Sequence, residues 1–351
     1  MAVLWLVLGP VTDWAAGDRV WTLPPDQEAA AVNAVRQTLL QAVGGTAALS
    51  ALVFTATNYL LNRRGQFTER YAVAIGQLAS EQLAERIGGI YALEHLMRES
   101  ERDHTTVVEV LAAFVRENAP VDDTAAPAPK GDRDRWMHPP AGTPDDPSAE
   151  RSAARVATDV QTALTVLARR PNRPEPNPVD LRSTDLRGAN LVGARLEAVL
   201  LVGAHLEHAY LGGARLEHAY LGGAHLEHAR LGGAHLEQAN LWGARLEHAY
   251  LGGAHLEHAH LGGAHLEHAY LGGAHLEHAY LGGAHLEHAN LGDAHLEQAN
   301  LGGADLAWAD LWSAHLAGAD LRMARLEGVR GLTAEQLASA ITGEVSGGGA
   351  G

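Results

Sequence analysis

Leucine recurs at every fifth position from Leu181 to Leu326, over thirty units without a gap. Alanine stands two residues before nearly every one of these leucines; Val179, Thr184 and Val199 are the exceptions. A period of five fits neither a helical face, which repeats every 3.6 residues, nor a strand face, which repeats every two. It fits a coil in which each unit forms one side and turns a corner. Leucine and alanine then point inward and the other three positions outward.

The unit A-x-L-x-x, as in 254–258 (AHLEH), resembles the repeat of the pentapeptide-repeat family. That resemblance implies a mostly β fold, a right-handed, four-sided parallel β-helix with four units per coil. It also implies that the leucines are the central inward residues and the alanines the small inward residues. The predicted inward ladder contains Leu206, Leu226, Leu246, Leu266, Leu286, Ala204, Ala224, Ala244, Ala264 and Ala284.

A second period of ten lies on the first, because LGGAHLEHAY recurs nearly unchanged between about residues 201 and 301. With twenty residues per coil, opposite sides match and outward residues repeat in columns. Exposed aromatic residues favour interfaces, although tyrosines in a column can instead simply stack between coils. The candidate interaction surface contains Tyr210, Tyr250, Tyr270, Glu207, Glu227, Glu247, Glu267, Glu287, His208, His228, His248, His268 and His288.

The chain before the repeats contains a run of 26 residues without a charge, from Gln37 to Asn62, which Arg63 and Arg64 follow. As a helix this run extends ~39 Å, enough to cross a hydrocarbon core of ~30 Å. We predict a membrane span at 37–61, with a buried or interfacial helix as the alternative. Residues 65–96 resemble the helical region before the repeats of membrane-anchored family members. The arginines favour a cytoplasmic bulk of the chain at the inner or plasma membrane of a bacterium.

Composition shifts divide the chain further. Thr333 and Gln336 have the spacing of a capping box and predict a short C-terminal helix. The predicted organisation is a membrane-anchoring region at 1–64, a small helical domain at 65–118, a disordered linker at 119–148, a capping helix and connector at 149–178, the β-helix at 179–330, and a C-terminal capping helix with a flexible tail at 331–351.

Charge narrows the choice of partners. The chain has 26 Lys or Arg against 42 Asp or Glu, a net charge of -16, and no cysteine. Direct nucleic-acid binding is disfavoured, because phosphates are bound mainly through Lys and Arg. The absence of cysteine excludes disulfides, thiolate catalysis and cysteine-ligated zinc. Some acidic members of the family mimic DNA and bind type II topoisomerases, so a rod that binds DNA gyrase is the alternative function that the resemblance implies.

Histidine raises two further alternatives. His255, Glu257 and His258 face outward on one coil, and imidazole and carboxylate suit zinc, nickel or copper. A flat, exposed ladder offers no second shell of supporting residues, so we assign no metal ligands and no cofactor. The repeats also hold eighteen histidines. Their protonation predicts a response to pH, and an unselected duplication of the HLEH unit explains them equally well.

No catalytic arrangement stands out in the sequence. We therefore predict a non-enzymatic, membrane-tethered scaffold that presents a rigid rod to a protein partner of unknown identity. A solenoid suits this role because its sides are ordered before binding and lose little entropy on docking. A homodimer is compatible with the same surfaces.

Overall fold

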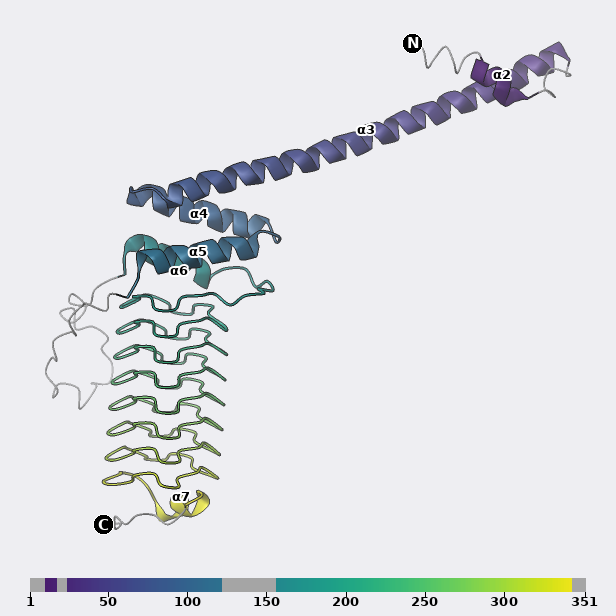
Figure 1. Cartoon of the computed structure of the whole chain (residues 1–351). Coiled ribbons are helices and arrows are strands. Elements are labelled where there is room, and N and C mark those ends of the chain that lie inside the picture. Colours follow the sequence, from purple (N-terminus) through teal and green to yellow (C-terminus); the bar gives the residue numbers. More distant parts are fainter. Residues whose placement is uncertain (1–9, 18–23, 122–155, 343–351) are drawn as a thin grey trace. The chain divides into compact units, whose positions relative to one another are not determined.

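The computed structural model describes residues 10–17, 24–121 and 156–342 (Figure 1). The chain divides into two compact units, Met1–Ala72 and Val73–Gly351.

The first unit contains α2 (Pro10–Ala16) and most of α3 (Pro25–Leu78), a helix of 54 residues that runs past the predicted boundary at residue 64. Within the described residues, no helix combines the length and the apolar character that crossing a bilayer requires. The predicted span at 37–61 is therefore wrong, and so are the membrane association and location inferred from it. The physical reason lies in composition: the stretch lacks charge, but Gln41, Thr46 and Thr55 interrupt its apolar residues.

The second unit begins with the end of α3 and a small helical bundle. Helices α4 (Leu83–Glu99), α5 (His104–Asn118) and α6 (Thr158–Ala168) pack against one another. Their shared core includes the fully buried Leu93, Leu111 and Leu164. Apolar residues recur at helical spacing on each of these helices, which explains why three helices bury one common face.

The repeats form a stack of coils, each twenty residues long. Residues at one position pair with their equivalents twenty residues further on, from Asp180 to Arg330. In each unit, as at 205–209, three backbone N–H groups donate to neighbouring coils and one closes the unit's own turn. The described residues contain only isolated parallel bridges here and no regular strand. The pentapeptide solenoid is thus supported, but the prediction of a mostly β fold is wrong, because turns leave a single paired residue on each side.

Leucine and alanine fill the interior of the stack. Every member of the predicted inward ladder, from Ala204 to Leu286, has at most 1% of its surface exposed. Burial of each leucine side chain contributes roughly 1.5–3 kcal/mol relative to exposure. Because the same two residue types recur at every level, each coil offers its neighbours the same apolar surface.

Both ends of the stack are covered (Figure 1). At the first coil, Arg195 N–H donates to the carbonyl of Ala168 at the end of α6, and Asp185 N–H donates to that of Ala119 after α5. At the last coil lies α7 (Ala334–Ser339), whose predicted capping box between Thr333 and Gln336 is present. Most of the predicted linker, together with residues 149–155 and 343–351, falls outside the described residues.

Candidate interaction surface and histidine–glutamate ladders

Each corner of the coil is a tight turn with a left-handed residue. In the unit that begins with Leu206, Ala209 N–H donates to the carbonyl of Leu206 at 3.0 Å. The residue before that alanine, His208, has φ of 59°. The equivalent residue on the neighbouring sides is glycine, as at Gly213, where φ is 62°. Glycine adopts this conformation without strain, whereas histidine does so at a cost. The two kinds of side therefore differ already in their backbones.

One glycine-rich side carries most of the predicted tyrosines. This tyrosine side is the column of Tyr210, Arg230, Tyr250, Tyr270 and Asn290. The rings of Tyr250 and Tyr270 stack with centroids 5.0 Å apart, and Tyr250 is half exposed. The Arg230 guanidinium lies 4.9 Å from the centre of the Tyr210 ring.

Glycine forms the floor beneath these rings. A Cβ added at Gly252 would lie 2.8 Å from a ring carbon of Tyr270 and 2.9 Å from the hydroxyl of Tyr250. The rings lie flat on the coil only because this position has no side chain. In the motif Y-L-G-G, the first glycine is therefore required because the tyrosine rings occupy the space of a side chain. The second glycine is favoured because its φ is positive.

The opposite glycine-rich side also carries exposed aromatic residues. This tryptophan side is formed by Tyr220, Asn240, Trp242, His260 and Tyr280. Tyr220 is 48% exposed and Trp242 is 59% exposed. Beside it, a shallow depression of about 400 Å³ is lined by His218, Gln238, His258 and His260.

Sequence reasoning did not single out Trp242. The available signal was the replacement of the first glycine of L-G-G-A by tryptophan at 241–244. The Trp242 ring lies over Gly262 and stacks with Tyr280 at a centroid separation of 6.4 Å, so three exposed aromatic residues follow one side within a few coils.

The predicted histidine column lies at the corners, away from the glutamates. These corner histidines, His208, His228, His248, His268 and His288, stack on one another with centroids 4.9 Å apart. Burial lowers the pKa of His228 to about 4, and the neighbouring His208 and His248 lower it further in the same direction. The pKa of His208, His248 and His268 is also lowered, mainly by burial. The column is therefore mostly neutral at neutral pH.

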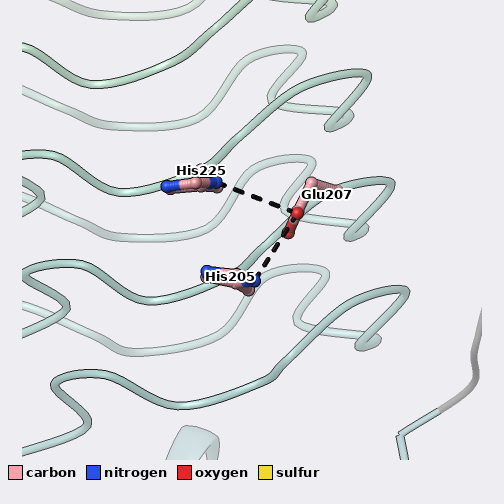
Figure 2. A group of neighbouring side chains, drawn as sticks. All are labelled: His205, Glu207 and His225. Carbon is pink, nitrogen blue, oxygen red and sulfur yellow. Dashed lines mark ion pairs between the residues drawn. The ribbon is translucent and has the colours of Figure 1, made fainter. Parts of the chain in front are cut away.

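A different histidine approaches each glutamate. The first histidine of H-L-E-H lies two residues before the glutamate, and its equivalent on the next coil lies on the glutamate's other side. Figure 2 shows this for Glu207, with His205 and His225 directed at one carboxylate. Their Nδ1 atoms lie 3.7 and 4.0 Å from Glu207 Oε1. We call the two such columns the histidine–glutamate ladders: one runs through 205, 225, 245, 265 and 285, the other through 215, 235, 255, 275, 295 and 315.

In some coils of the histidine–glutamate ladders, arginine replaces the histidine that lies beside the glutamate. The Arg245 guanidinium lies 3.1 Å from Glu227 and 3.6 Å from Glu247, and so bridges glutamates of successive coils. Arg215 likewise lies 3.2 Å from both Glu197 and Glu217. The space between two stacked carboxylates is thus a site for a cation.

The glutamates are only partly solvated. Ten of them, Glu207, Glu217, Glu227, Glu237, Glu247, Glu257, Glu267, Glu277, Glu287 and Glu297, have a buried Oε2 atom without a hydrogen-bond partner among the described residues. Burial raises the pKa of Glu227 to about 7; Glu207 and Glu247 act in the same direction, and Arg245 partly opposes them. Burial also lowers the pKa of His225 to about 4, with His205 and Arg245 contributing. Burial therefore governs the protonation of both Glu227 and His225.

Several groups in the ladders bring metal-ligating atoms together. In His205–Glu207–His225, His265–Glu267–His285, His275–Glu277–His295 and His295–Glu297–His315, the potential donor atoms lie within 4.8 Å of one another. The trio considered from sequence does not converge. His255 lies 3.4 Å from Glu257, but His258 is a corner residue that stacks on His278 at 4.8 Å.

The regular register and the two end caps define a solenoid repeat protein. The family described as pentapeptide repeats matches in eight copies, including residues 180–217, 200–238, 214–253, 249–287 and 289–328. The chain therefore belongs, through its repeat region, to the pentapeptide-repeat family. A comparison with curated proteins finds no significant match.

Solved structures of the same kind are similar to the repeat region. HetL, a pentapeptide repeat protein involved in heterocyst differentiation regulation in Nostoc sp. strain PCC 7120, is 35% identical, with 44% of this chain and 78% of that chain covered and a TM-score of 0.24. Rfr23 from Cyanothece 51142 is 30% identical, with 34% and 60% covered and a TM-score of 0.16. QnrB1, a plasmid-mediated fluoroquinolone resistance protein, is 18% identical, with 43% and 83% covered and a TM-score of 0.30. At these TM-scores the structures add nothing to the family assignment.

Proposed function

We propose that this protein is a non-enzymatic scaffold whose repeat solenoid binds a protein partner through the tryptophan side. The observation that carries the proposal is the exposure of Tyr220, Trp242 and Tyr280 along one side of a rigid coil. Aromatic residues dominate the binding energy of many interfaces, and they do so best where the backbone is already ordered.

The tyrosine side is the second surface that the sequence nominated, and it remains a candidate through Tyr210, Tyr250 and Tyr270. Its rings are more occupied with packing, because Tyr250 and Tyr270 stack on each other over Gly252. The tryptophan side is favoured because three of its aromatic residues, Tyr220, Trp242 and Tyr280, are exposed, whereas the tyrosine side exposes two, Tyr250 and Trp312. Nothing in the comparisons supports a homodimer.

Site-specific photocrosslinking tests the proposal. A photoreactive amino acid is placed at Trp242 in the full chain, and a matched variant carries it at Trp312, which is 64% exposed at the equivalent turn position on the opposite side. We expect a discrete crosslinked protein from position 242 and a weaker or absent one from position 312. Equal labelling from both positions would show that the tryptophan side has no special role.

The positions of the ladder glutamates disfavour the alternative function, a rod that mimics DNA and binds DNA gyrase. A mimic must display its negative charges, whereas the ladder glutamates are partly buried and face imidazole or guanidinium groups. Titration of the full chain into a DNA gyrase supercoiling reaction decides the matter. Inhibition that is lost when ladder glutamates are replaced by glutamine would favour the mimic over the scaffold.

A further inference from the structure

The histidine–glutamate ladders contain a feature that protein binding does not use. Where arginine occupies the ladder, its guanidinium supplies positive charge to two glutamates at 3.1–3.6 Å. Where histidine occupies it, the imidazole Nδ1 lies 3.3–4.0 Å from the same carboxylates. His295 Nδ1, for example, is 3.9 Å from Glu277 and 3.8 Å from Glu297. The histidine coils therefore repeat the same arrangement of two stacked carboxylates, with an imidazole in place of the guanidinium.

The groups that face this space are metal ligands. In each His–Glu–His group of the ladders, the glutamate has one imidazole from its own coil and one from the next, as Figure 2 shows for Glu207. Zinc binds imidazole nitrogen and carboxylate oxygen readily, and three protein ligands with an open fourth position are a common arrangement. A site of this kind would neutralise the carboxylate as Arg245 does, but with an exchangeable ion.

From these contacts we propose that the histidine–glutamate ladders bind divalent transition-metal ions of the zinc class, each held by one glutamate and two histidines from successive coils. The sites are His205–Glu207–His225 and His265–Glu267–His285 on one side. On the opposite side His275–Glu277–His295 and His295–Glu297–His315 share His295. Since one Nδ1 atom binds one ion, only one of these last two sites fills completely at a time.

The distances require a modest adjustment. Ligand atoms in a tetrahedral zinc site lie about 3.3–3.5 Å apart, given bonds of ~2.0–2.2 Å. His275 Nδ1 and Glu277 Oε1 are already 3.4 Å apart. The paired imidazoles stack with centroids 4.3 Å apart at His205 and His225, so their Nδ1 atoms must tilt toward the ion. About a quarter of each of these two side chains is exposed, which leaves room for the tilt and an open path from solvent.

The chain itself suggests the decisive variant. His265→Arg copies the natural Arg245 one coil earlier, fills the space with a fixed cation and keeps the ion pairs that the coil tolerates. His258→Ala is the matched control, because it removes a histidine of the same repeats that lies at a corner and stacks on His278. Thermal unfolding of both variants in chelator verifies that each is folded.

The measurement is bound zinc per chain, determined by elemental analysis after equilibrium dialysis of the full chain, purified without a polyhistidine tag. We expect His265→Arg to bind one ion fewer than the unsubstituted protein and His258→Ala to bind the same number. A cobalt-substituted sample should show the visible absorption of a tetrahedral site, and His265→Arg should reduce it. Unchanged stoichiometry in His265→Arg, or loss of an ion in His258→Ala, would overturn the proposal.

Discussion

The four sides of the coil share one interior but have two kinds of exterior. On the histidine–glutamate sides, charged groups face each other across successive coils and a histidine occupies the left-handed turn position. On the aromatic sides, glycine occupies that position and aromatic rings such as those of Tyr250 and Trp242 lie over glycine. Leucine and alanine are equally buried behind both. The difference teaches that the interior determines the fold while the outward positions are free to acquire separate chemistries.

The strongest test of this comparison replaces the shared interior. Leu256 lies behind a histidine–glutamate side and Leu251 behind an aromatic side, and both are buried. Leu256→Ala and Leu251→Ala should each lower the free energy of unfolding by about 2–5 kcal/mol, because each leaves a cavity between coils. Chemical denaturation measures both. Losses that differ by more than ~1 kcal/mol would show that the two kinds of side do not share an equivalent core.

A smaller effect is expected at the glycine floor of the tyrosine side. Gly252→Ala places a Cβ under 3 Å from Tyr250 and Tyr270, so the rings must move, at a cost of about 1–3 kcal/mol. Gly212→Ala is the control, because a Cβ there would meet only the carbonyl of Gly232 at 3.7 Å, an ordinary contact. Tyrosine fluorescence and thermal unfolding report both changes. Equal stability of the two variants would show that packing of the tyrosine rings does not require glycine at position 252.

Much of the fold could be predicted from the period and the family resemblance together. A leucine at every fifth position fits a coil, and the four units per coil that the resemblance implies place Tyr250 beside Tyr270, as the bridges show. Which histidine of H-L-E-H meets the glutamate could not be predicted, because it depends on the turn. The left-handed φ of His258 directs that side chain to the corner, while His255 lies beside Glu257.

The predicted membrane span and the predicted strands were wrong for the same reason. Each was inferred from a single feature of the sequence. A stretch without charge was equated with a membrane span, although its polar residues, such as Gln41, keep it from being uniformly apolar. Family resemblance was equated with strands, although turns on both sides of residues such as His225 leave only isolated bridges. Trp242 was not predicted as an interaction residue because tryptophan occurs only once in its column, and the prediction rested on residues that recur in columns.

The corner histidines, together with His225 of a ladder, predict how stability changes with pH. Histidines of the unfolded chain titrate near ~6.5, whereas His225 and His228 in the folded protein have a pKa of about 4. As the pH falls below ~6.5, these histidines bind protons in the unfolded chain but not in the folded chain. The free energy of unfolding therefore decreases between pH ~6.5 and about 4. Glu227, whose pKa is raised to about 7, acts oppositely and gains stability as pH falls from about 7 to ~4.5.

Five histidines have a lowered pKa against one glutamate with a raised pKa, so the net expectation is a lower unfolding temperature at pH 5 than at pH 7.5. His228→Gln should reduce that difference, because glutamine does not titrate and already occupies the same turn position at Gln238. Gln238→Asn serves as the control for the turn. The same pH dependence in all three proteins would contradict the role given to the corner histidines.

The smallest effect concerns turn strain. His258 has φ of 58°, a conformation that costs most residues about 1–2 kcal/mol and glycine almost nothing. His258→Gly should therefore be more stable than His258→Ala by about 1 kcal/mol, as judged from denaturation midpoints. Equal midpoints would mean that the left-handed turn imposes no backbone cost on a residue with a side chain at this position.

The difference between the two kinds of side is tested most directly by locating bound zinc. Crystals of the full chain grown with zinc, and measured for anomalous scattering on both sides of the zinc absorption edge, would place each ion. The account predicts peaks between His265, Glu267 and His285 and their equivalents in the ladders, with none beside Arg245. Peaks confined to the corner histidines or to the aromatic sides would contradict it.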